Sequence, residues 1–155
     1  MEKYDWEHLN HLQVGKYAEY LVKMELVRNG MDVYTSEVDD RGIDFVIRID
    51  QGKYIDVQVK SIRKSKTSYI FFPKSSFKLR KDLMAAIVIF INGKPPLISL
   101  ILSERWRNPD EVFKDKDYPE GTSPPEWGFS VSKKGLAVLE EYTVEKGIKK
   151  ITQNK

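Results

Sequence analysis

The chain has 155 residues, of which 41% are hydrophobic and 32% are charged. This balance is typical of one globular domain that buries its own core, and it excludes a disordered tail. The absence of cysteine excludes disulfides, thiolate catalysis and cysteine-based zinc sites, and two histidines, His8 and His11, argue against a histidine-rich metal centre. Any metal must therefore bind oxygen ligands. The formal net charge of +3 permits a nucleic-acid partner without requiring one.

No segment has the pattern of a membrane span or of a secretion signal. The longest apolar run, residues 84–91, is far too short to cross a bilayer. Residues 1–10 lack the basic start and the apolar stretch of a signal peptide. We therefore expect a soluble, cytoplasmic protein that has no membrane partner.

The first predicted element is an amphipathic helix. Apolar residues recur at helical spacing from Val14 to Leu26, and Gly30 follows where a helix would end. A short strand is expected at residues 33–36, and the polar residues 39–42 predict a turn.

The next segments predict a β-hairpin with two distinct faces. Residues 43–49 alternate apolar and polar side chains, and residues 55–59 repeat that alternation after a turn at residues 50–52. The apolar side of this hairpin should face the core, and its polar side should be exposed.

Further strands are expected at residues 68–72, 85–91 and 97–102. Ser103 is a candidate cap for one helical turn that contains Trp106.

A long loop and a final helix should complete the chain. Residues 108–126 are rich in Pro, Asp and Gly and show no periodicity, which predicts a surface loop. Ser132 is a candidate N-cap for the last helix, and the basic tail at residues 149–155 is expected to fray. Together the elements predict a single α/β domain over residues 1–155, with a mixed central sheet flanked by helices.

Polar side chains of the hairpin should converge on one face. Alternation along a strand makes Asp56, Gln58 and Lys60 project together, and Asp44 faces the same side from the partner strand. Oxygen-bearing side chains in this arrangement can chelate a hard cation such as Mg²⁺. Glu19 lies on the apolar side of the first helix, where a carboxylate is costly unless it is paired or metal-bound. If that helix packs over the hairpin, Glu19 reaches the mouth of the site.

These residues resemble the PD-(D/E)xK nuclease superfamily, which includes archaeal Holliday-junction resolvases and many restriction endonucleases. The resemblance covers about residues 15–61. It consists of Gly-Lys-Tyr-Ala-Glu at 15–19, Gly-Ile-Asp at 42–44 and Asp-Val-Gln-Val-Lys-Ser at 56–61. It implies a restriction-endonuclease-like fold and a metal-dependent endonuclease that hydrolyses DNA phosphodiester bonds with Mg²⁺ or Mn²⁺. RNA as the substrate and a homodimeric assembly are both compatible with it.

The resemblance also implies roles for single residues. Lys60 would position the attacking water and stabilise the developing charge. The implied metal ligands or assistants are Glu19, Asp44, Gln58 and the backbone carbonyl of Val59.

The chain departs from the family pattern at two positions. Gln58 stands where the family has an acidic residue, so the site loses one negative charge and should bind a metal more weakly. Asp56, on the same face, could compensate. Ile43 stands where the family name has proline. The alternative function is a nuclease-fold module that binds nucleic acid or protein and has lost catalysis.

Ordinary structural roles remain open for two of the acidic residues. Glu19 could form a surface ion pair with Lys23, four residues later on the helix. Asp44 could pair with Arg48 or Arg41.

A basic segment follows the hairpin, and four of its cations are candidates for binding a nucleic-acid backbone: Lys60, Arg63, Lys64 and Lys66. Aromatic residues interleave with the basic residues and could stack on exposed bases: Tyr69, Phe71, Phe72 and Phe77. Alternate aromatic residues in a strand also commonly pack in the core, so both interpretations stay open.

Overall fold

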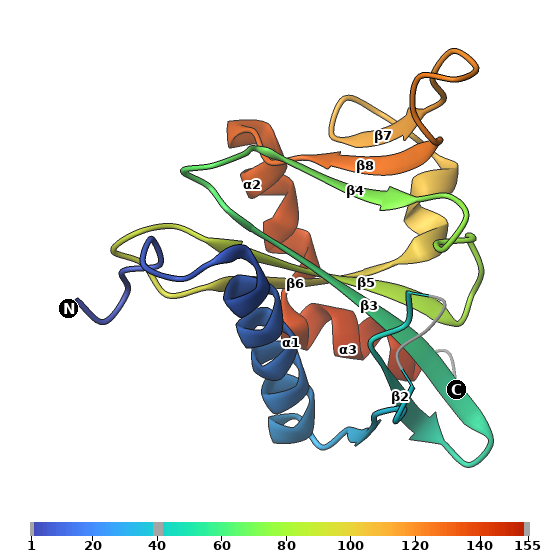
Figure 1. Cartoon of the computed structure of the whole chain (residues 1–155). Coiled ribbons are helices and arrows are strands. Elements are labelled where there is room, and N and C mark those ends of the chain that lie inside the picture. Colours follow the sequence, from blue (N-terminus) through green and yellow to red (C-terminus); the bar gives the residue numbers. More distant parts are fainter. Residues whose placement is uncertain (1, 39–41, 154–155) are drawn as a thin grey trace.

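The computed structural model describes residues 2–38 and 42–153 of the chain (Figure 1). Its α-helices are α1 (His11–Arg28), α2 (Lys133–Val138) and α3 (Val144–Gln153), and its 3₁₀ helices are η1 (Ser103–Arg107) and η2 (Leu139–Tyr142). Its strands are β1 (Asp32–Tyr34), β2 (Phe45–Asp50), β3 (Lys53–Arg63), β4 (Tyr69–Pro73), β5 (Leu83–Phe90), β6 (Leu97–Leu102), β7 (Phe113–Lys116) and β8 (Glu126–Ser130). In the described chain no helix is both long enough and apolar enough to span a membrane.

The strands form two sheets. The larger sheet has the order β1-β2-β3-β5-β6, and all its neighbours are antiparallel except β3 and β5, which are parallel. The smaller, antiparallel sheet has the order β4-β8-β7. Figure 1 shows the smaller sheet on one side of the larger one, with α1 and α3 on the other side. The predicted α/β fold with a mixed central sheet and flanking helices is confirmed, although a second sheet covers one of its faces.

Strand β5 is the centre of two hydrophobic cores. All eight of its residues are buried, and because both faces of the strand are covered, its sequence is a continuous apolar run. Its even-numbered residues belong to the core under α1 and α3, and its odd-numbered residues belong to the core under the smaller sheet.

Helix α1 forms as its periodicity predicts. Asn10 and Gln13 make a reciprocal capping box at its start, and its buried residues are Val14, Ala18, Val22 and Leu26. The predicted hairpin also forms, with Phe45 opposite Val57 and Ile47 opposite Ile55. Strand β3 extends to Arg63, four residues beyond the predicted end, because β5 pairs along its whole second half.

The prediction that Ser103 caps a helical turn is wrong. Its hydroxyl instead accepts a hydrogen bond from the Arg80 backbone N–H (2.9 Å) and donates one to the Arg80 carbonyl (2.7 Å). This buried serine therefore ties η1 to the segment before β5.

The prediction of a structureless loop over residues 108–126 is also wrong. Strand β7 lies within it, and Phe113 and Val112 are buried in the core under the smaller sheet. Strand β8 supplies the pairing partner, so this segment becomes ordered through contacts with residues that follow it in the chain. Residues 108–112 and 117–125 remain loops, and the second of them projects from the body in Figure 1.

The end of the chain is more ordered than predicted. Ser132 caps α2, since its side chain accepts a hydrogen bond from Gly135 N–H (3.1 Å). The predicted single helix is divided into α2, η2 and α3, and Ile151 in the expected frayed tail is buried in the core with α1. Residues 154–155 of that tail, and residues 39–41 of the predicted turn, lie outside the described residues.

Candidate active site

The site begins where β2 and β3 separate. Asp44 N–H donates to the Val57 carbonyl (3.0 Å), and the Asp44 carboxylate accepts a hydrogen bond from Val59 N–H (2.6 Å). The side chain of Asp44 therefore takes the place that a backbone carbonyl of β2 would occupy in a longer ladder. This contact fixes the Asp44 carboxylate beside the middle of β3 and opens the end of the hairpin.

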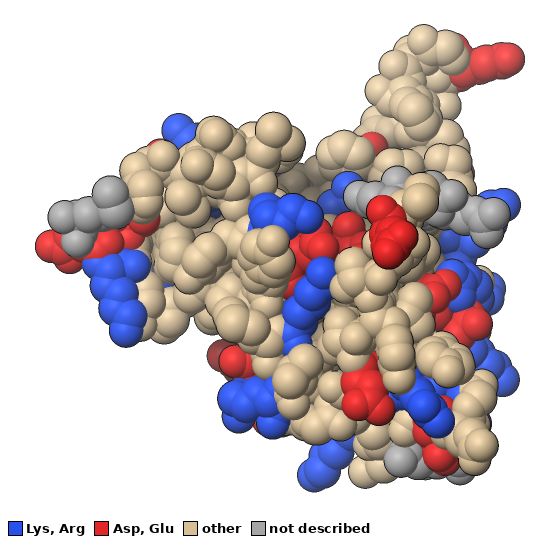
Figure 2. All heavy atoms as spheres, turned by 60° about the horizontal axis from the view of Figure 1, so that its bottom comes forward, with Lys and Arg blue, Asp and Glu red and all other residues tan. Residues whose placement is uncertain are grey.

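A pocket of about 240 Å³ lies at this opening, between α1 and the hairpin. It brings together Glu19 from α1, Asp44 and Val59, which are three of the predicted site residues. The other residues that line it come from the first half of α1: His11, Leu12, Gly15 and Lys16. Figure 2 shows one face of the molecule, on which acidic and basic side chains lie close together around a hollow near the centre.

Glu19 is held between two lysines. One of its carboxylate oxygens lies 3.0 Å from Lys23 Nζ, and the other lies 3.4 Å from Lys16 Nζ. Its side chain is 16% exposed, so these ion pairs offset part of the cost of withdrawing a carboxylate from water. The ion pair with Lys23 is therefore present, and Glu19 lines the pocket as well.

Lys16 is a pocket residue that the sequence interpretation missed. Its ammonium group is well exposed and lies at the mouth of the pocket, three residues before Glu19. The helical period could have identified it, because residues three apart share a helix face.

Gln58 is placed differently from its prediction. Its side chain is only 5% exposed, whereas the polar face of the hairpin was expected to be open. That face is covered because Gly42 and Ser76 lie against it: a Cβ atom added to Gly42 would be 2.7 Å from Gln58 Nε2 and 3.2 Å from the Cβ of Ser76. Gln58 Oε1 is buried and accepts no hydrogen bond from the described part of the protein.

Lys60 follows Gln58 on the same side of β3 and is half-buried. Within residues 2–38 and 42–153 no carboxylate lies within 4.0 Å of the Lys60 ammonium group, and neither Lys60 nor Gln58 lines the pocket that Glu19 and Asp44 share. The predicted residues thus divide into two groups. Glu19, Asp44 and Val59 meet in the pocket on the α1 side of the larger sheet, whereas Gln58 and Lys60 project from the opposite face of β3, on the side of the smaller sheet.

Asp56 does not compensate for the neutral Gln58. Its carboxylate pairs with Arg80 (2.6 Å), and Arg80 also contacts Asp82 (2.5 Å). Burial disfavours the charge of Arg80, but its hydrogen bonds to Asp82 and Asp56 outweigh that effect and raise the pKa of the guanidinium. The charge of Asp56 is therefore already balanced by a permanent cation.

The predicted metal ligands all present oxygen atoms, and His11, which also lines the pocket, adds an imidazole nitrogen. Within residues 2–38 and 42–153 no three His, Cys, Asp or Glu side chains cluster as a metal site. A cation would thus depend on two carboxylates, from Glu19 and Asp44, together with the neutral oxygens of Gln58 and the Val59 carbonyl. The unpaired Gln58 oxygen fits this set, because a hard divalent cation prefers oxygen ligands and a buried acceptor needs a positive partner.

The predicted nucleic-acid cations are partly engaged elsewhere. Arg63 donates to the carbonyl of Leu9 (2.5 Å), and Lys66 pairs with Glu7 (3.5 Å), so both hold the N-terminal segment. Lys64 donates to Ser68 (2.6 Å). Of the interleaved aromatic residues, Phe72 and Phe77 are in the core, as the alternative interpretation predicts, whereas Tyr69 and Phe71 are not.

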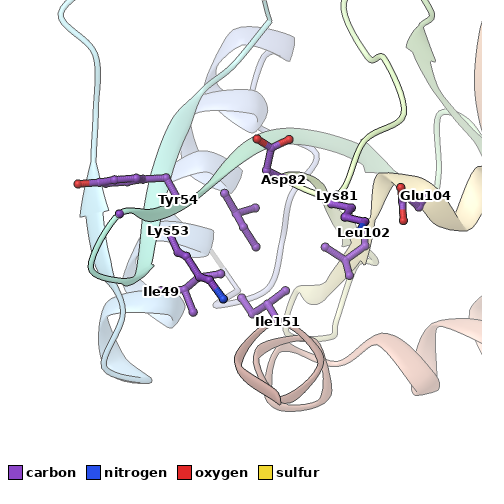
Figure 3. A pocket seen from close by; sticks show the side chains of 10 residues that line it. Ile49, Lys53, Tyr54, Lys81, Asp82, Leu102, Glu104 and Ile151 are labelled. Carbon is purple, nitrogen blue, oxygen red and sulfur yellow. The ribbon is translucent and has the colours of Figure 1, made fainter. Parts of the chain in front are cut away.

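A larger cavity, of about 770 Å³, lies elsewhere, between the turn of the β2–β3 hairpin and α3 (Figure 3). It has an apolar floor that includes Ile49, Ile55 and Ile151, and it has a charged rim that includes Lys81 and Asp82. No predicted site residue lines it. Its size alone therefore does not make it the active site.

The comparisons with known proteins provide little independent information. No family model and no curated protein matches the sequence. Among solved structures, the chain is similar to the bacterial homing endonuclease I-Ssp6803I, with 14% sequence identity and a TM-score of 0.46 over 86% of this chain and 94% of that one. A TM-score below 0.5 is too low to assign a function, so the case for the site depends on its geometry.

Proposed function

We propose that the protein is a metal-dependent endonuclease that hydrolyses DNA phosphodiester bonds. The residues that would act are Glu19, Asp44, Gln58, Lys60 and the backbone carbonyl of Val59. The observation that carries the proposal is the buried, unpaired oxygen of Gln58 on the strand whose Val59 N–H orients the Asp44 carboxylate. An unsatisfied buried acceptor costs about 1–3 kcal/mol, and binding a cation would offset that cost.

A bound Mg²⁺ or Mn²⁺ would polarise a phosphate oxygen and lower the pKa of a water molecule. Asp44, whose carboxylate is fixed by Val59 N–H, would hold the cation together with the amide oxygen of Gln58. Glu19 would orient water at the pocket, where its carboxylate is held between Lys16 and Lys23. Lys60 would place a positive charge beside the phosphate as negative charge develops in the transition state.

The charges around the site favour a phosphate-bearing substrate. Lys16 lies at the mouth of the pocket, and Lys60 projects from the opposite face of the neighbouring strand β3. Lysines at such positions attract a polyanion and are screened by salt, so binding should weaken as ionic strength rises. DNA is the proposed substrate, and RNA is the second substrate to test.

The neutral side chain of Gln58 favours a second candidate function, a module that binds nucleic acid or protein without cleaving it. Two carboxylates give a cation less negative charge than three would, and Asp56 is occupied by Arg80. Such a module would keep its affinity for nucleic acid and would show no metal-dependent cleavage.

A cleavage assay separates the two functions. The full chain is incubated with supercoiled, linear, branched and single-stranded DNA, and with RNA, in Mg²⁺, Mn²⁺ or EDTA. We expect cleavage that depends on the metal, that is abolished by Asp44→Asn and that falls about 10²- to 10³-fold in Lys60→Met, since one preorganised donor is lost. Asp56→Asn is the matched control on the same strand and should retain activity. Cleavage that survives both site substitutions would indicate a contaminant, and no cleavage of any substrate would favour the binding module.

A further inference from the structure

The outer surface of the smaller sheet carries one exposed aromatic side chain, Phe71, beside the half-buried Tyr69, Lys114 and Lys116. On β4, Ile70 and Phe72 point into the core, so Tyr69 and Phe71 point away from it. Phe71 is 48% exposed, which is unusual for a phenylalanine in the middle of a strand. We call this surface the aromatic face, and it consists of Tyr69, Phe71, Lys114, Lys116 and Gly128.

A glycine makes room for the aromatic face. The Tyr69 hydroxyl donates a hydrogen bond to the Glu126 carboxylate (2.6 Å), so its ring reaches across from β4 to β8. A Cβ atom on Gly128 would lie 1.9 Å from the Tyr69 hydroxyl oxygen, so only glycine allows this placement. The Phe71 ring is nearly parallel to that of Tyr69, with 20° between the planes and 6.4 Å between the centroids. The two rings therefore present parallel surfaces on which flat groups can stack.

The charge of the face complements a phosphate backbone. Lys116 Nζ lies 4.3 Å from the centre of the Tyr69 ring, and Lys114 faces outward from β7 beside Gly128. The nearby carboxylate of Glu126 is buried and hydrogen-bonded to Tyr69, so little of its negative charge is at the surface. Two ammonium groups beside these rings are suited to a strand that has both flat bases and negative phosphates.

The aromatic face is connected to the candidate active site through the end of β4. Ser76, which lies against Gly42 beside Gln58, donates its backbone N–H to the carbonyl of Pro73 (3.1 Å). Pro73 is the last residue of β4, two positions after Phe71. A nucleic-acid strand that leaves the site along β4 would therefore meet Phe71 and then Tyr69.

We infer that the aromatic face binds the unpaired bases of a nucleic-acid strand, with Phe71 stacking on a base and Lys114 and Lys116 contacting phosphates. This inference rests on the proposed nucleic-acid substrate and adds that a single-stranded segment is held next to the site. A duplex, whose bases are stacked on one another, would gain much less from Phe71.

Binding of a fluorescent 20-nucleotide oligothymidine and of a 20-base-pair duplex, measured by anisotropy in EDTA, tests the inference without cleavage. We expect Phe71→Ala to weaken binding of the single strand about 5- to 150-fold and binding of the duplex much less. Phe71→Trp, which keeps a flat ring, should keep the affinity for the single strand. Tyr54→Ala removes an aromatic residue of equal exposure (47%) from β3, and it should change neither affinity. Lys116→Gln should reduce the salt dependence of binding by about one phosphate contact.

The inference would be overturned if Phe71→Ala bound the oligothymidine as tightly as the unchanged protein, or if it lost equal affinity for the single strand and the duplex. It would also be overturned if Phe71→Ala and Tyr54→Ala lost equal affinity, or if no oligonucleotide bound. A dimer that dissociates in Phe71→Ala while oligothymidine affinity stays unchanged would assign the face to a second copy of the chain. The proposed nuclease activity fails separately. If binding depends on Phe71 but no metal-dependent cleavage is found, only the proposed nuclease activity is refuted. If cleavage is found but Phe71→Ala does not change binding, only the proposed role of the aromatic face is refuted.

Discussion

Replacing Gln58 by glutamate places a carboxyl group where the protein has a buried, unpaired amide oxygen. The change adds almost no volume, so its effect is electrostatic. Without a metal, burial raises the pKa of the introduced carboxyl, by about 2–3 units for a site of this depth, even though Lys60 follows two positions later on the same side of β3. Each unit corresponds to about 1.4 kcal/mol, so the free energy of unfolding should fall by about 3–4 kcal/mol at pH 8.

The sign of the pH dependence follows from proton binding. Between about pH 4 and its raised pKa the introduced carboxyl holds a proton in the folded state and releases it in the unfolded state, so stability falls as the pH rises through this range. At pH 4 the carboxyl is neutral in the folded state and mostly neutral in the unfolded state, so the variant should unfold at nearly the same temperature as the unchanged protein. At pH 8 in EDTA its midpoint should be about 6–16 °C lower for a chain of this length.

Adding Mg²⁺ should reverse the loss, because the introduced charge would bind the cation more tightly than the amide does. A concentration of 100 times the dissociation constant stabilises a protein by about 2.7 kcal/mol. Thermal unfolding from pH 4 to 8, with EDTA or Mg²⁺, measures the change in stability. Titration calorimetry at pH 8 measures the affinity for Mg²⁺. Gln58→Met is the control: it should stay within about 1 kcal/mol of the unchanged protein and lose metal binding. A destabilisation independent of pH, or a Mg²⁺ response no larger than that of the unchanged protein, would refute the reasoning.

Three further substitutions test single contacts. Gly42→Ala should lower the free energy of unfolding by about 1–3 kcal/mol in urea, because φ at this position is +73° and the new Cβ would meet Gln58. Gly52→Ala is the control: its φ is +74° but its Cβ would meet no atom, so it should cost only the backbone strain of about 1 kcal/mol. Asp56→Asn should leave metal affinity unchanged in calorimetry and lower stability by at most about 1 kcal/mol, since it loses only a partly exposed ion pair. Burial and the hydrogen bond to a buried glutamate raise the pKa of Tyr69, so it keeps its proton when unfolded tyrosine loses it near pH 10, and stability should fall above that pH. Tyr69→Phe should remove the last step of the absorbance titration of the tyrosines, and an unchanged titration would contradict the assignment.

The sequence predicts the part of the fold that local periodicity determines. Helix α1 has its apolar residues at helical spacing and its cap at Asn10, and the hairpin of β2 and β3 has strict alternation around a glycine turn. Both elements form where they are expected. Because the hairpin and α1 position Glu19, Asp44 and Val59, the meeting of these residues in one pocket could be anticipated from local pattern.

Other features depend on contacts between segments distant in the chain. Strand β7 lies in a stretch whose sequence has no strand pattern. Its four residues form a strand only because they pair with β8. Gln58 is buried, with Gly42 against its side chain and Ser76 against Gly42, and no pattern within β3 indicates these neighbours. Likewise, Arg80 lies 24 positions from Asp56, so the ion pair that occupies Asp56 could not be read from spacing along the hairpin.

The most direct test of the proposed site is anomalous diffraction from crystals soaked in Mn²⁺. We predict one strong peak within roughly 2.0–2.3 Å of oxygens from Asp44, Gln58 and the Val59 carbonyl, and we predict its loss in Asp44→Asn crystals. At saturating Mn²⁺, no peak at this position, or a peak only at Asp82 and Glu104 on the rim of the larger cavity, would contradict the proposed metal site.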